Sequence, residues 1–192
     1  MTFSSLTPAT ADAVEALIVE SNTNPLNPQI GAPKGMVGNH LKRIEAGNYY
    51  HLVTFFKGDF LQAAMIQGQM PKAGYKTDEH ARVIAKFAEL LPKGEAEKPF
   101  GFSTMVPVFG KAVDENGRAE VYTAMMGLNK NLVRQGRTLP PKTDLVPCQL
   151  LVLLDPGHPD VELLVKLGFT NQGNYPEFYP PAVRTLLSYP LV

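Results

Sequence analysis

The chain has a single cysteine, no excess of charge of either sign and no long apolar run. One cysteine excludes an internal disulfide and is typical of a reducing compartment. Eighteen lysines and arginines balance eighteen aspartates and glutamates, so no net field would attract nucleic acid or an anionic membrane. No apolar stretch approaches the roughly 20 residues of a membrane span, and the first residues do not have the composition of a signal peptide. We therefore expect a cytoplasmic protein.

The length and the spacing of special residues predict one self-sufficient domain. A chain of 192 residues is most naturally a single domain over 1–192. At that size roughly 70% of the surface of the unfolded chain can be buried without a metal or disulfide. Cys148 begins an apolar run, where we expect a small buried hydrophobe rather than a nucleophile. The four histidines have none of the spacings of a zinc site, so we expect no bound metal.

Apolar periodicity and turn residues predict a mixture of helices and strands. Thr7-Pro8 should start a helix, because threonine caps helices and proline suits their first position. Asn116-Gly117 can supply the positive φ angles of a tight turn, so we expect a hairpin across 114–117. The expected strands are 3–6, 49–56, 60–67, 100–113, 118–128, 149–154 and one after Gly168, and the expected helices are one after Thr7 and those at 36–46, 77–91, 158–167 and 182–187.

This order of elements predicts the fold class. Helices among mostly antiparallel strands indicate an α+β, or mixed α/β, domain with a central, mostly antiparallel, twisted sheet flanked by helices. The strand at 149–154 is nearly all apolar, as expected for a strand covered on both faces. The segments 21–34 and 129–147 are rich in proline and turn residues, and we expect irregular loops there.

Three segments resemble, in the same order, the GNAT superfamily of N-acyltransferases. Within 148–173, the stretch from Leu163 to Phe169 resembles the family's LYEKLGF signature. Residues 6–13 look like the family's first strand and helix, and 50–66 look like its second and third strands. The resemblance implies a single GNAT-like domain whose sheet splays open between its fourth and fifth strands, with acyl-CoA in that gap.

The resemblance also implies a loop, usually Arg/Gln-x-x-Gly-x-Gly/Ala, that holds the CoA pyrophosphate with backbone N–H groups at a helix N-terminus. Two degenerate candidates exist, and both are also compatible with a basic surface loop. The segment 72–76 precedes a strong predicted helix but comes early in the chain. The other follows the strand expected at 118–128, as the chain order requires, although Pro140 and Pro141 leave little room for a helix. We prefer this second candidate, which consists of Arg134, Gln135, Gly136 and Arg137.

Transfer of an acyl group from a thioester to an amine needs a base and benefits from an acid for the leaving thiolate. In the family that acid is often a tyrosine in the fourth helix, and alignment on 167–169 puts Leu164 at its position. Tyr175 and Tyr179 on the following strand are the nearest substitutes. The base is often a glutamate on the fourth strand, and Glu120 lies on the strand expected to take that place. Each of these three residues also fits a purely structural role.

These residues are consistent with two functions. The first is an acyl-CoA-dependent N-acyltransferase that moves an acetyl or other acyl group to an amine of a small molecule or protein. The second is a catalytically degenerate GNAT-like binding or regulatory protein, suggested by Leu164 and by the degenerate pyrophosphate loop. A third interpretation is an unrelated α+β protein in which Leu-Gly-Phe is only a helix stop. A structure with no parting of the sheet beside the strand 149–154 would establish the third interpretation.

Overall fold

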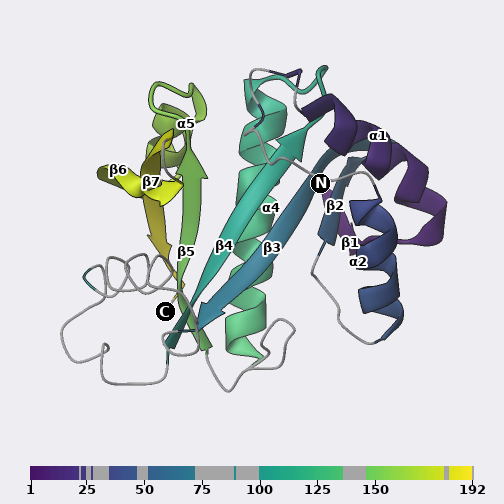
Figure 1. Ribbon diagram of the computed structural model, residues 1–192, viewed down its shortest axis with the longest axis horizontal. Helices are drawn as coiled ribbons and strands as arrows, with labels where there is room; N and C mark the ends of the chain where they lie inside the picture. The colour runs from purple at the N-terminus through teal and green to yellow at the C-terminus, as the bar shows by residue number, and fades with distance from the viewer. Residues whose placement is uncertain are drawn as a thin grey trace.

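A computed structural model describes residues 1–21, 23, 24, 27, 35–46, 52–71, 89, 100–135, 146–179 and 182–191. Within these ranges the chain forms one seven-stranded sheet with helices on both faces (Figure 1). The predicted α+β class is therefore confirmed. No helix among these residues is long and apolar enough to cross a membrane.

The sheet is mostly antiparallel, as predicted. Its strands lie in the order β1-β2-β3-β4-β5-β7-β6. Neighbouring strands run antiparallel except β4 and β5, which are parallel. The strands are β1 (Thr2–Ser5), β2 (Leu52–Lys57), β3 (Phe60–Pro71), β4 (Phe100–Phe109), β5 (Val146–Leu154), β6 (Thr170–Tyr179) and β7 (Ala182–Pro190).

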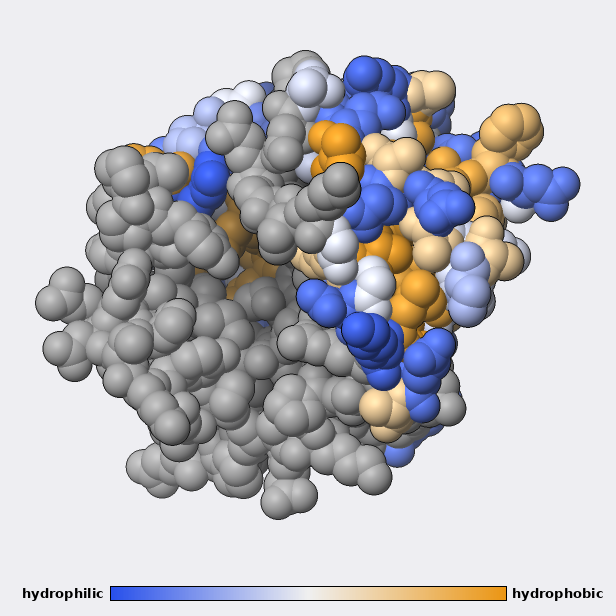
Figure 2. All heavy atoms as spheres, turned by 45° about the vertical axis from the view of Figure 1, so that its right-hand side comes forward, coloured by the Kyte–Doolittle hydropathy of each residue, from blue (hydrophilic) through white to orange (hydrophobic). Residues whose placement is uncertain are grey.

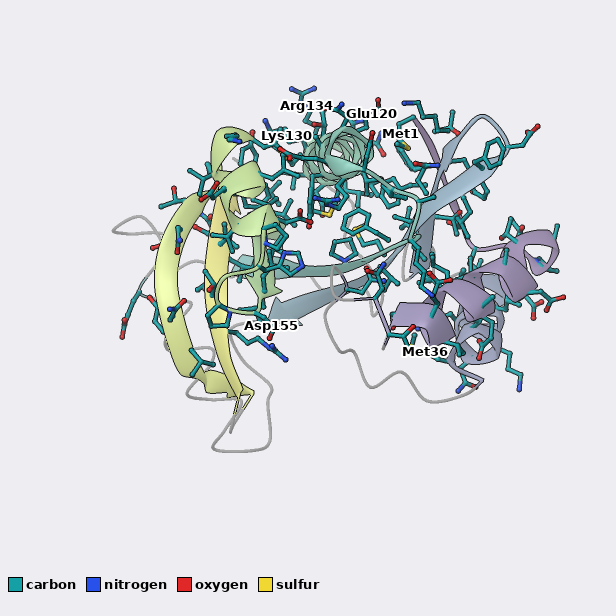
Figure 3. All side chains as sticks on the ribbon, turned by 90° about the horizontal axis from the view of Figure 1, so that it is seen from above. Met1, Met36, Glu120, Lys130, Arg134 and Asp155 are labelled. Carbon is teal, nitrogen blue, oxygen red and sulfur yellow. The ribbon has the colours of Figure 1, made fainter. Side chains whose placement is uncertain are left out.

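The helices cover both faces of the sheet. Figures 1 and 3 show α1 and α2 on one face and α4 on the other. Buried side chains of α5 belong to the same core cluster as those of α4, which places the two helices over one face. The described helices are a short 3-10 turn (Pro8–Thr10), α1 (Ala11–Ser21), α2 (Met36–Glu45), α4 (Glu115–Arg134) and α5 (Asp160–Lys166).

Two hydrophobic cores result, because successive strand residues point to opposite faces of a sheet. Phe109 packs with α4 and α5. Its ring lies edge-on to the ring of Tyr122, with 5.5 Å between the two ring centroids. The neighbouring Val108 packs instead with α1 and α2. Figure 2, turned toward the side that carries α1 and α2, shows hydrophobic side chains exposed among hydrophilic ones. Val19 and Phe60 are the most exposed large hydrophobic residues, and single residues of this kind are ordinary on a protein surface.

Several local predictions are confirmed. The 57–59 turn joins β2 to β3, and Gly58 has a φ of 60°. The apolar segment 149–154 is a strand between β4 and β7. Helix α5 ends at Gly168, whose φ is 97° and whose N–H donates to the Val165 carbonyl. Left-handed backbone of this kind favours glycine, which explains why the sequence signal was reliable here.

The predicted hairpin across 114–117 is wrong, because residues 118–128 lie in α4. The carboxylate of Asp114 accepts a hydrogen bond from the Gly117 N–H at 2.8 Å and caps the helix. An aspartate three residues before a glycine suits a helix cap as well as a turn. Buried positions along α4 recur at helical spacing, and they are Gly117, Arg118, Val121, Tyr122, Met125, Leu128, Asn129 and Leu132.

The predicted helix at 182–187 is also wrong, because this segment is strand β7. It lies between β5 and β6, and its pairing with β5 runs from Gln149 opposite Pro190 to Leu154 opposite Thr185. The first part of the loop expected at 129–147 continues α4 as far as Arg134. The helix expected at 77–91 falls almost entirely outside the described residues, and the side chain of Cys148 is outside them too.

Two glycines of α4 should respond in opposite ways to alanine. A Cβ added at Gly117 would lie 2.8 Å from the side chain of Val113, whereas at Gly127 it would meet nothing within 4 Å. We expect Gly117→Ala to destabilise the protein by about 1–3 kcal/mol through overpacking. Gly127→Ala should stabilise it by about 1 kcal/mol through helix propensity. Urea unfolding of both variants measures this, and equal effects would contradict the helical assignment of α4.

Candidate functional site

The backbones of β4 and β5 part before either strand ends. Their parallel pairing runs from Phe100 opposite Val146 to Met105 opposite Val152. Beyond that point β4 remains paired with β3 as far as Phe109, and β5 remains paired with β7 as far as Leu154. Figure 1 shows the two strands diverging toward their C-terminal ends. We call the region between 106–109 and 153–154 the β4–β5 gap.

Proline explains where the pairing stops. Gly110 donates its N–H to the Gln62 carbonyl of β3 at 3.0 Å. Alternation along the strand then points the backbone groups of Phe109 and Pro107 to the opposite edge, toward the gap. Proline has no N–H to donate, so the ladder to β5 loses a donor at that position. The parting of the strands therefore has a local cause in the sequence.

The backbone of Phe109 is hydrogen-bonded on its gap side by side chains from the segment between α1 and α2. Its N–H donates to the Asn27 Oδ1 at 2.8 Å, and its carbonyl accepts from the Asn27 Nδ2 at 2.9 Å. The Nδ2 of Asn24 donates to the same carbonyl at 3.2 Å. Both asparagines are buried, with exposures of 5% and 6%. One side-chain amide thus pairs with β4 as a peptide group of a neighbouring strand would.

The N-terminus of α4 follows β4 directly, across the turn 110–114. Residues 114–119 have the form Asp-x-x-Gly-x-Ala. This differs from the implied pyrophosphate-loop pattern only in having aspartate where arginine or glutamine is usual. The sequence alone did not indicate it, because residues 114–117 fit a hairpin turn as well. The match of Gly117 and Ala119 to the pattern, followed by helical spacing, is the signal that could have found it.

The first turn of α4 is already occupied by negative charge. Asp114 accepts from the Gly117 N–H, and Glu115 follows it. Free N–H groups and the positive end of the dipole make a helix N-terminus attractive to an anion. A carboxylate at the cap takes up one of these donors and repels a second anion. The first turn of α4 thus has the glycine and alanine of the implied pattern, while a carboxylate already occupies one of its N–H donors.

A buried ion pair joins α4 to α5, the helices that follow β4 and β5 in the chain. The Arg118 Nε donates to the Asp160 Oδ1 at 2.8 Å, and the side chain of Asp160 is fully buried. The Tyr122 hydroxyl donates to the other carboxylate oxygen at 2.9 Å. Burial and the nearby Asp160 carboxylate raise the pKa of Tyr122 well above its usual value. The backbone N–H of Asp160 also donates to the Nδ1 of His158 at 3.0 Å.

A cleft of about 580 Å³ lies between the start of α4 and the outer side of α5. Charged side chains of both signs line it, including Glu115, Glu162 and Lys166. His158 adds an imidazole whose Nδ1 serves as an acceptor within the protein. Within the described part of the chain, no group of three or more metal-ligating side chains comes together. The cleft is thus a recess with charged side chains along α5, and it contains none of the gap residues.

Glu120, the expected base, lies on α4 and not on a fourth strand. Its Oε1 accepts from the Lys57 Nζ at 3.0 Å, and its side chain is 41% exposed. Figure 3 shows Glu120 on the outer side of α4, away from the sheet. The prediction that it belongs to the strand before the site is therefore wrong, since β4 holds that place.

The two tyrosines expected as acids lie on the edge strand β6. Two strands, β5 and β7, separate β6 from β4 in the sheet order. The Tyr175 hydroxyl donates to the Gln172 carbonyl at 2.9 Å. Tyr179 is at the end of β6, opposite Ala182, and its side chain is not among those described. The structure does not bring these residues together with Glu120.

The preferred pyrophosphate loop, 134–137, does not follow a strand. Arg134 is the last residue of α4 and Gln135 its C-cap, while Gly136 and Arg137 fall outside the described residues. A helix C-terminus presents carbonyl oxygens and the negative end of the dipole, which disfavour phosphate. The prediction that this segment follows a strand is therefore wrong, because residues 118–128 are helical. The alternative at 72–76 lies outside the described residues.

Leu164, in the position of the family's acid, is fully buried in the core shared by α4 and α5. The Phe169 N–H donates to its carbonyl at 3.0 Å, which closes the end of α5 together with Gly168. The ring of Phe169 is buried and lies 5.2 Å from that of Tyr189. The Leu-Gly-Phe segment thus closes α5 and packs into the core, and Leu164 supplies no acid.

The raised pKa of Tyr122 predicts a loss of stability at alkaline pH. The folded protein keeps this proton where the unfolded chain releases it, so stability falls as the pH rises above about 10. Tyr122→Phe should lower stability by about 1–3 kcal/mol near neutral pH, because a hydrogen bond to a carboxylate is lost. Its stability should then decline less steeply than that of the wild type above about pH 10. Urea unfolding over this range measures the difference, and parallel curves would contradict the assignment.

Comparison with known proteins agrees with this geometry. No protein-family model and no curated protein matches the sequence. Solved structures do match, among them Arabidopsis thaliana NAA60 in complex with acetyl-CoA, with a TM-score of 0.61, 9% identity and coverage of 98% of this chain and 97% of that one.

Two further solved structures also match this chain over nearly its whole length. A GNAT-family acetyltransferase from Streptococcus pneumoniae has a TM-score of 0.58 at 12% identity, with 98% of each chain covered. FeeM, an N-acyl amino acid synthase from uncultured soil microbes, has a TM-score of 0.58 at 12% identity, covering 99% of this chain and 90% of that one. Likeness at such low identity shows the fold alone. Together with the parted β4 and β5 strands, it shows that this chain has the GNAT fold.

Proposed function

We propose that this protein is an acyl-CoA-dependent N-acyltransferase that transfers an acetyl or other acyl group to an amine of a small molecule or protein. The observation that carries the proposal is the β4–β5 gap, with the backbone amide and carbonyl of Phe109 directed into it. A strand edge that no neighbouring strand covers can pair with extended chains that contain amide groups. The pantetheine arm of CoA is such a chain. NAA60, which has the same fold, was solved with acetyl-CoA.

The proposed chemistry needs no further cofactor. The nitrogen lone pair of a neutral amine attacks the thioester carbonyl, an N–C bond forms, and the C–S bond then breaks with its electron pair on sulfur. The amine's proton passes to a base or to solvent. A thiol has a pKa near 8.5, so its thiolate leaves near neutral pH without a strong acid. The buried Leu164 therefore does not by itself prevent the reaction.

Coenzyme A should stabilise the wild-type protein. A ligand that binds only the folded state adds about 2.7 kcal/mol at a concentration 100 times its dissociation constant. Thermal unfolding with coenzyme A, acetyl-CoA and a longer acyl-CoA measures this, with ATP as a phosphate-bearing control. Turnover is then followed as free thiol released in the presence of a panel of amines. Unchanged melting temperatures with all three thiol compounds would count against the proposal.

A second candidate is a binding or regulatory protein that performs no transfer. The observation that favours it is the Asp114 carboxylate on the Gly117 N–H, where a pyrophosphate would need a free donor. The buried Leu164 in place of an acid points the same way. Under this proposal the gap binds a ligand that is not turned over. Measurable acyl transfer to any amine would exclude the second candidate.

Removing the charge of Asp114 should strengthen the binding of coenzyme A. Asp114→Asn keeps a good N-cap while the repulsion between the carboxylate and the ligand's phosphates disappears. At a separation of about 4 Å in water that repulsion is about 1 kcal/mol, or roughly fivefold in affinity. Asp12→Asn removes a similar charge from the first turn of α1, on the other face, and should change nothing. Calorimetric titration compares the three proteins, and equal affinities would show that Asp114 does not face the ligand.

A further inference from the structure

We propose that Asn27 occupies the place on β4 where the amide of a bound donor arm pairs, so that the donor must displace the Asn27 side chain to bind. This inference rests on the proposed function, because it concerns the same gap. It adds that a side chain of the protein itself competes with the donor for that site. The competitor belongs to the segment between α1 and α2, far from α4 and α5 in sequence.

The hydrogen bonds of Asn27 satisfy both backbone groups of one residue. Phe109 donates at 2.8 Å to the side-chain carbonyl, and its own carbonyl accepts at 2.9 Å from the side-chain amide. A secondary amide offers the same acceptor and donor to a strand edge. The side chain of Asn27 therefore presents to β4 the groups that a pantetheine amide would present. The two cannot pair with Phe109 at the same time.

The competition between Asn27 and a donor takes place at the backbone of a single residue, Phe109. Pro107, the preceding residue on the gap-facing edge, has no N–H. The chain turns away at Gly110, whose N–H is already used by β3. Along the edge from 106 to 110, Phe109 thus supplies the only backbone N–H directed into the gap. A donor arm that pairs with this edge through an amide carbonyl has to use it.

The burial of the asparagines shows that this contact is built into the fold. Asn27 is 5% exposed and Asn24 is 6% exposed, and both side chains reach the Phe109 carbonyl. Buried backbone groups must find partners when no ligand is present, since an unpaired group is costly. Asn27 provides these partners in the free protein. When a donor binds, its amide becomes the hydrogen-bond partner of the Phe109 backbone in place of Asn27.

The test measures the affinity of coenzyme A and of pantetheine for the wild type and for Asn27→Ala. Pantetheine carries the amides without the phosphates, so it isolates pairing with β4 from the charge of Asp114. We expect both ligands to bind Asn27→Ala roughly tenfold more tightly, because the two hydrogen bonds of Asn27 no longer have to be broken first. Asn129→Ala is the matched control. This asparagine is equally buried and donates to the Met125 carbonyl within α4, so its loss should leave the affinity unchanged.

A second variant keeps the test valid if Asn27→Ala does not fold. Asn27→Asp has nearly the same shape and still accepts from the Phe109 N–H, but it cannot donate to the Phe109 carbonyl. It should also bind neutral pantetheine more tightly than the wild type does. Hydrogen exchange of the Phe109 amide provides a separate readout. Exchange should be slow in the wild type, faster in Asn27→Ala, and slow again when Asn27→Ala is saturated with coenzyme A.

The outcomes separate this inference from the proposed function. Equal affinity in the wild type and both Asn27 variants would overturn the inference and leave the proposed function standing. Weaker binding to the variants would also overturn it, because Asn27 would then be a ligand contact. Binding to the variants but not to the wild type would support it most strongly. Absence of binding to all of the proteins would reject the proposed function, and the inference with it.

Discussion

The structure around the gap depends on one constraint, which is that the backbone groups of β4 must remain hydrogen-bonded after β5 has parted from it. Pro107 removes a donor from the ladder, and the parallel pairing ends at Met105. Phe109, still held by β3 on one side, then has an N–H and a carbonyl with no strand opposite them. The fold meets the requirement with the side chain of Asn27, which comes from a distant segment and pairs with both groups.

A different interaction joins α4 and α5, the helices that follow β4 and β5 in the chain. Arg118 and Tyr122 of α4 both bond to the buried carboxylate of Asp160 at the start of α5. Breaking a buried ion pair by removing one partner typically costs about 3–5 kcal/mol, so the spacing of the two helices is strongly determined. The acidic cap at Asp114 lies at the N-terminus of the same α4. The chain therefore has the GNAT fold, while Asp114 and Leu164 differ from the residues that the resemblance implies at these positions.

Local signals in the sequence were sufficient for some elements and misleading for others. The turn at Gly58 and the stop at Gly168 were predictable because both need left-handed backbone. Helix α4 was not, because Asp114 to Gly117 suits either a helix cap or a hairpin, and packing of the following residues against the sheet decides between them. Strand β7 depends on pairing with β5 and β6. The contact between Asn27 and Phe109 joins positions 82 residues apart, so no local pattern could indicate it.

The side chain on the strand edge has a kinetic consequence. The buried Asp160 carboxylate ties the start of α5 to α4 and has no part in this exchange. The step that varies is whether the backbone N–H and carbonyl of Phe109 are available to pair with a donor. Under the proposed exchange, the rate at which a donor associates would reach a plateau with rising concentration, set by how often Asn27 leaves the strand edge. Ligands that differ only in their acyl group would share that plateau and would differ in how long they stay.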